Sequence, residues 1–152
     1  MGIFGRIQEI IETQASSGDF SPLTHEELLI ECEDQLIKLQ NQLQKVSTEL
    51  VAAQKEVPLF EQQREMYENQ LLKWTRKVDE FLNDQTPNAS TIKALKNRDY
   101  YQWHVNNLTN TLAYTEERIA TLKLQITELK EEIDKTEKQR NVFAQQNKNA
   151  SK

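Results

Sequence analysis

Apolar residues recur at alternating intervals of four and three along two long stretches of the chain, one on each side of residue 85. The first seam consists of Cys32, Leu36, Leu39, Leu43, Val46, Leu50, Ala53, Val57, Phe60, Arg64, Tyr67, Leu71, Trp74, Val78 and Phe81. The second seam consists of Tyr101, Val105, Leu108, Leu112, Thr115, Ile119, Leu122, Ile126, Leu129, Ile133, Thr136, Arg140 and Phe143. Arg64 is the one polar member of the first seam, and the second has Thr115, Thr136 and Arg140. A repeat of about 3.5 residues sustained this long specifies a left-handed coiled coil.

Residues 83–88 (NDQTPN) separate the two seams and are typical of a turn. A short connection makes the two helices antiparallel neighbours, with residue i facing roughly residue 172 − i. We therefore predict an all-α fold, a long antiparallel coiled-coil helical hairpin with a short N-terminal amphipathic helix. We expect the helix at residues 1–14, a linker at 15–22, the hairpin at 23–147 with arms of about 23–83 and 87–147, and a disordered tail at 148–152.

Helix start signals agree with these boundaries. Ser21-Pro22 places a cap residue before a first-turn proline, the segment 24–27 (THEE) is a capping box, and Thr86-Pro87 repeats the cap-then-proline arrangement. Pro58 lies inside the first arm, where a proline costs about 3 kcal/mol and kinks the axis. Because the first seam passes through it in phase, we expect a bend and not a break. The bend is either a hinge for a curved assembly or a kink tolerated in a long helix.

The segment 1–14 (MGIFGRIQEIIETQ) forms a second kind of pattern. Its apolar residues share one helical face, whereas its charged residues and Gln8 lie on the other. Such a helix either docks on its own hairpin or lies in a bilayer interface. We favour the membrane, because a linker separates the segment from a two-helix rod that offers little groove to receive it. The predicted membrane-binding residues are Ile3, Phe4, Arg6, Ile7, Ile10 and Ile11.

The free energy of this membrane contact is expected to be small for a single chain. Burial of a large aliphatic side chain yields roughly 1.5–3 kcal/mol, and ordering the helix consumes part of that gain. We therefore expect stable attachment only when many copies present the segment together.

A row of positions one residue after the first seam points to such an assembly. It comprises Ile30, Ile37, Gln44, Val51, Pro58, Glu65, Leu72 and Asp79, and half of these are aliphatic. A two-stranded coil does not cover this flank, so neighbouring rods can pack there. Tyr100, Trp103 and Tyr114 add aromatic surface near the turn. The predicted assembly surface is Ile30, Ile37, Val51, Leu72 and Trp103.

The net charge and the composition argue against some classes of function. The net charge is −5 and the apolar fraction is 37%, which suits long solvated helices and argues against nucleic acid as a partner. Acids gather between Asp19 and Asp34, and bases gather between Lys73 and Arg98. Rods staggered lengthwise would set one against the other, although solvated faces are the usual role of charge runs.

No catalytic or metal-binding constellation is apparent, so we predict neither an enzyme nor a cofactor or metal site. Glycine is absent after Gly18, which excludes a phosphate-binding loop, and His25 and His104 are far apart in sequence. Cys32, the only cysteine, is interpreted as a small core residue rather than a regulatory thiol, and fits a reducing compartment. No apolar run reaches the length of a membrane-spanning helix. We expect a cytoplasmic protein that is peripheral to the inner (or thylakoid) membrane.

The opening MGIFGRIQEII resembles the start of the phage-shock-protein A and plastid vesicle-inducing protein family, bacterial relatives of the ESCRT-III membrane remodellers. The segment around Trp74, Lys77 and 81–83 is similar to the family's Trp-x-x-Lys stretch before the hairpin tip. Residues 111–134 (TLAYTEERIATLKLQITELKEEID) resemble its returning arm. The resemblance implies a first helix that inserts into membrane and hairpins that stack side by side. Because relatives continue into further helices, it also implies a shortened member that co-assembles with longer ones.

Two functional hypotheses follow. The first is a peripheral membrane-binding scaffold, self-assembling or co-assembling, that remodels or protects the inner membrane. The second is a soluble coiled-coil adaptor or regulator whose N-terminal helix binds a protein partner. The resemblance makes the second credible, because some members of the family restrain a transcriptional activator.

Overall fold

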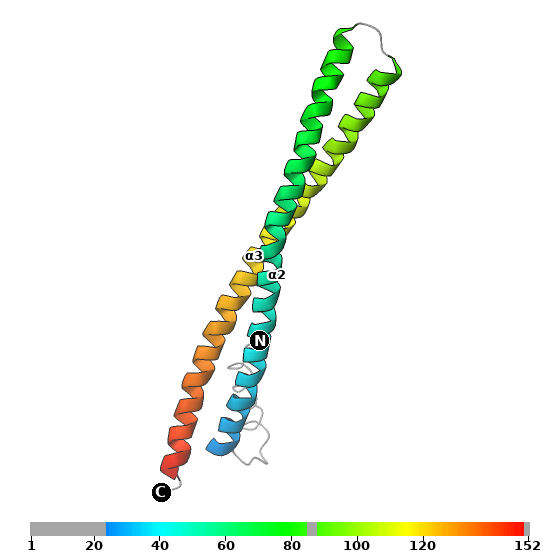
Figure 1. Ribbon diagram of the computed structural model, residues 1–152. Coiled ribbons are helices and arrows are strands. Elements are labelled where there is room, and N and C mark those ends of the chain that lie inside the picture. The colour runs from blue at the N-terminus through cyan, green and yellow to red at the C-terminus, as the bar shows by residue number, and fades with distance from the viewer. Residues whose placement is uncertain (1–23, 85–87, 151–152) are drawn as a thin grey trace, which may run out of the picture. The chain divides into compact units, whose positions relative to one another are not determined.

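The computed structural model describes residues 24–84 and 88–150 of the chain. Within these ranges it contains two long helices and no strand: α2 (His25–Asn83) and α3 (Ala89–Ala150), which run antiparallel (Figure 1). The predicted all-α helical hairpin is therefore confirmed. The N-terminal helix expected at residues 1–14 and the linker expected at 15–22 lie outside the described residues.

Side-chain caps define where each helix begins. The Glu27 amide donates to Thr24 Oγ1 at 3.1 Å, which is half of the capping box expected there. At α3 the cap is Asn88, whose Oδ1 accepts from the Thr91 amide at 3.0 Å, while the Asn88 amide donates to Thr91 Oγ1 at 3.4 Å. This reciprocal pair satisfies two backbone donors at the helix start. Consequently α3 starts at Ala89, after the expected 87, and it continues to Ala150, past the expected end at 147.

The described chain divides into two compact units. Unit 1 comprises residues 24–49 and 122–150, and unit 2 comprises Leu50–Thr121. The core of unit 1 is a cluster of Leu28, Cys32, Leu39, Leu129 and Phe143, with Leu29, Leu43, Val46 and Ile133 packed against it. Its residues come from both α2 and α3, so the two helices bury one continuous apolar strip between them.

Unit 2 has its own core. Its buried apolar residues are Ala53, Val78, Ala94, Leu108 and Leu112. Tyr67 on α2 stacks on His104 of α3 with ring centroids 4.5 Å apart and lies 6.1 Å from the Tyr101 ring. The predicted register sets residue 67 against residue 105, close to these observed neighbours.

Every member of both seams is buried or half-buried. The polar members of the seams each have a local hydrogen-bond or ion-pair partner where one is described. Thr115 and Thr136 are buried, and their hydroxyls donate to the carbonyls of Thr111 and Glu132, each at 2.8 Å. No buried side-chain nitrogen or oxygen of the described residues lacks a hydrogen-bond partner. Helix α2 also continues through Pro58 without a break.

Candidate membrane-binding and assembly surfaces

The predicted membrane-binding residues precede the described part of the chain. Ile3, Phe4, Arg6, Ile7, Ile10 and Ile11 all lie within residues 1–23, whose structure is not described. Their role therefore stays a prediction from the sequence pattern.

The predicted assembly residues are all on the surface. Ile30, Ile37, Val51, Leu72 and Trp103 are between 49% and 62% exposed, although the seams beside them are covered. Ile30 and Ile37 belong to unit 1, whereas Val51, Leu72 and Trp103 belong to unit 2. Each unit therefore presents large apolar side chains to solvent, as an assembly surface requires. Pro58, the predicted hinge, is also exposed.

Further exposed apolar residues were not predicted from the sequence. They are Leu59, Met66, Leu82, Ile92, Leu124 and Val142. Leu59 and Met66 each lie one residue before a member of the first seam, on the flank opposite to the predicted row. The same heptad reading applied to both sides of the seam identifies them. The uncovered apolar surface of unit 2 is thus two-sided.

An open groove lies on unit 2, with a volume of about 740 Å³. Its lining consists of Gln63, Met66, Tyr67, Asn69, Gln70 and Tyr101, so α3 contributes one aromatic ring and α2 the rest. Next to the groove, the rings of Tyr100 and Trp103 pack edge-on against the His104 ring, with ring centroids 4.5 and 4.9 Å from it. The lining is neutral and combines aromatic faces with amides, which is the composition of a protein-contact surface more than of a catalytic pocket.

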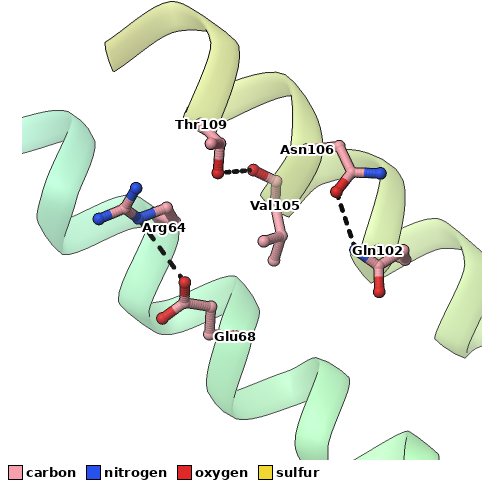
Figure 2. Close-up of polar contacts among 6 residues, drawn as sticks. All are labelled: Arg64, Glu68, Gln102, Val105, Asn106 and Thr109. Carbon is pink, nitrogen blue, oxygen red and sulfur yellow. Dashed lines mark hydrogen bonds and ion pairs between the residues drawn. The ribbon is translucent and has the colours of Figure 1, made fainter. Parts of the chain in front are cut away.

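Short polar contacts hold the other flank of unit 2, as Figure 2 shows. Arg64 pairs with Glu68 at 3.6 Å along α2. On α3, the Gln102 amide donates to Asn106 Oδ1 at 2.9 Å, and the Thr109 hydroxyl donates to the Val105 carbonyl at 2.8 Å. All three contacts join residues one turn apart on one helix, so they stiffen each helix without linking α2 to α3.

Two lysines of the turn-proximal basic stretch lie over the Trp74 ring. Their Nζ atoms are 4.4 Å (Lys77) and 5.9 Å (Lys73) from the ring centroid, within the range of cation–π attraction. Arg98 lies 3.8 Å from the Asp99 carboxylate. Two lysines of the predicted basic stretch are therefore held on α2 by an indole ring.

Cys32 is fully buried in the core of unit 1. Burial raises the pKa of its thiol above the ordinary value of 9.0, and Glu31 raises it further, while Arg140 acts in the opposite direction. A neutral thiol of this kind packs as a small apolar group and is a poor nucleophile. In the described residues, no group of three or more His, Cys, Asp or Glu side chains is arranged to hold a metal ion. Likewise, neither α2 nor α3 offers a segment apolar enough to cross a bilayer.

Comparison with known proteins connects these surfaces to one family. No curated protein and no solved structure gave a significant match. The model of the PspA/IM30 family, in contrast, matches residues 2–152, which is nearly the whole chain and includes both arms of the hairpin. This family consists of non-enzymatic proteins that bind membranes and self-assemble, which agrees with a hairpin whose seams are covered and whose flanks are apolar and exposed. The chain belongs to the PspA/IM30 family.

Proposed function

We propose that this chain is a peripheral membrane-binding scaffold of the ESCRT-III-like kind, which remodels or protects the inner (or thylakoid) membrane from its cytoplasmic side. The hairpin assembles with copies of itself or with longer family members, and the N-terminal helix attaches the assembly to lipid. One observation supports the proposal most strongly. Both units expose large apolar side chains, although the seam residues of both helices are already buried or half-buried.

Energetics link assembly to attachment. Five partly inserted aliphatic and aromatic side chains, reduced by the cost of ordering the segment, leave only about a few kcal/mol per chain. A monomer would therefore exchange rapidly between lipid and water. When copies are held side by side, each further contact becomes intramolecular, and avidity increases by orders of magnitude without any new interaction.

Substitution of Phe4 tests the attachment. Phe4→Glu places a charge in the predicted apolar face, and we expect it to reduce co-sedimentation with vesicles about tenfold or more, because the lost burial and the added desolvation together exceed 1.4 kcal/mol. The helical circular dichroism of the hairpin should not change. Gln8→Glu adds the same charge on the polar face and is the matched control.

If Phe4→Glu and Gln8→Glu bind vesicles as the wild type does, insertion of the N-terminal helix is wrong. Capture of a protein partner by a wild-type chain that ignores vesicles would favour the adaptor hypothesis instead.

A further inference from the structure

Unit 2 carries charge of opposite sign on its two flanks. The flanks are defined relative to the seams, and the spacing of the second seam extends upstream through Arg98, Ala94 and Thr91, none of which is exposed. Positions one residue before a seam member lie on one side of each helix, and positions one residue after it lie on the other. Because α2 and α3 are antiparallel, the "before" positions of both helices share one side of the hairpin. Stacking of Tyr67 on His104, itself a "before" position, agrees with this placement.

The "before" side is the basic face. On α2 it runs through Leu59, Gln63, Met66, Gln70, Lys73 and Lys77. On α3 it runs through Lys93, Asn97, Tyr100, His104, Asn107 and Thr111, and then Tyr114 and Arg118. These stretches contain four bases and no acid. Glu56 and Glu80 also occupy "before" positions of unit 2, so this side as a whole carries a net charge of +2.

The "after" side is the acidic face. Its six acids are Glu61, Glu65, Glu68, Asp79, Asp99 and Glu116, and no base occupies an "after" position of unit 2. Figure 2 shows part of it, with Glu68 on α2 and Gln102, Asn106 and Thr109 on α3. Arg64 and Arg98 reach it from the seams and pair with Glu68 and Asp99. The four other acids stand on exposed positions.

We propose that the basic face of one copy binds the acidic face of the next, so that unit 2 is the electrostatic joint of a side-by-side row. This inference rests on the proposed function and identifies its partner as a second copy of the chain. Charge complementarity selects that occupant: a lipid surface would use the basic face alone, whereas a second copy uses both faces.

Apolar side chains supply the rest of the joint. Leu59, Met66 and Tyr100 are more than half exposed on the basic face, and Leu72, Leu82 and Ile92 are more than half exposed on the acidic face. Two different faces meet, so the contact is heterologous and leaves one free face of each sign at the ends of the row. The row therefore grows by addition of copies, and like faces repel, which fixes the orientation of each new copy.

Charge reversal with mixing tests the joint. Gln63→Glu/Gln70→Glu/Lys73→Glu/Lys93→Glu makes the basic face net negative, and Glu61→Lys/Glu65→Lys/Asp79→Lys/Glu116→Lys makes the acidic face net positive. Each full-length variant alone then carries two faces of one sign. We expect the assembled fraction of each variant to fall about tenfold or more relative to the wild type. Analytical ultracentrifugation measures this fraction, both in the presence of anionic vesicles and in their absence.

An equimolar mixture of the two variants restores opposite faces and should recover the wild-type assembled fraction. The matched control pair makes the same charge changes in unit 1, with the bases replaced on the flank opposite to the predicted assembly row: Gln42→Glu/Gln125→Glu/Lys38→Glu/Lys45→Glu and Glu33→Lys/Asp34→Lys/Glu128→Lys/Glu131→Lys. Each control variant should assemble by itself. Circular dichroism checks that every variant keeps its helices.

Three results would overturn the joint: variants that assemble alone, a mixture that stays dispersed, or a wild-type chain that never assembles. Reduced vesicle binding of the basic-face variant, with assembly unchanged, would assign that face to lipid instead. The proposed membrane attachment stands or falls separately, through the vesicle binding of Phe4→Glu.

Discussion

Thr115 and Thr136 occupy seam positions at which a hydroxyl would be costly if it were left unpaired. Each donates to the carbonyl four residues earlier, so the methyl group is free to pack and the polar atom is satisfied within one helix. Arg64 extends from the seam to Glu68 and keeps its charged end near water. The seam pattern predicted the burial of these positions, but their hydrogen-bond partners depend on local helix geometry and were not predicted.

The burial of Cys32 can be tested through the reactivity of its thiol. Because burial raises the pKa of its thiol, we expect its reaction with a disulfide reagent such as DTNB to be at least about tenfold slower in the folded chain than in urea. The unfolded chain releases this proton at lower pH than the folded chain does. Stability from this group is therefore complete below the ordinary thiol pKa and is lost as the pH rises above it.

The measurement is the free energy of unfolding from pH 7 to alkaline pH for the wild type and for Cys32→Ala. The wild type should lose more stability than Cys32→Ala on the alkaline side. Equal slopes, or rapid thiol modification in the folded chain, would contradict a buried neutral thiol.

At the scale of the elements, the periodic pattern predicted both helices and their antiparallel register, whereas the helix start at the turn was placed two residues early. Thr86-Pro87 has the sequence of a cap followed by a first-turn proline, yet Asn88 caps α3. A sequence cannot decide between adjacent cap candidates, since the choice depends on which side chain reaches a free amide.

The Asn88 cap can be tested by substitution. Asn88→Ala removes the acceptor for the Thr91 amide, and we expect it to destabilise unit 2 by about 0.5–2 kcal/mol. Hydrogen exchange of the first amides of α3 should accelerate in parallel. Asn110→Ala, at an exposed position within α3, is the control and should leave stability unchanged or slightly raised. Equal effects of the two substitutions would argue against the cap.

The hairpin combines covered seams with uncovered flanks. Both seams are satisfied within one hairpin, so the exposed aliphatic and aromatic residues of units 1 and 2 are available to partners. The sequence predicted one flank of this surface from a single heptad row. On the opposite flank, Leu59 and Met66 follow from the same heptad pattern, whereas the groove beside Tyr67 became apparent only when α3 was placed against α2. Likewise, each helix carries bases before its seam and acids after it, but only the antiparallel pairing places the rows of like sign on the same side of the hairpin.

Family membership and these surfaces lead to a single physical claim: a membrane contact too weak for one chain holds when assembly presents it in many copies. The most direct test compares vesicle binding of the wild type with that of the basic-face reversal variant, which keeps the N-terminal segment intact, on neutral vesicles across a range of protein concentrations. We predict that wild-type binding rises more steeply than in proportion to concentration, and that the variant binds weakly and in simple proportion. Equal binding per chain for both proteins at every concentration would contradict the claim.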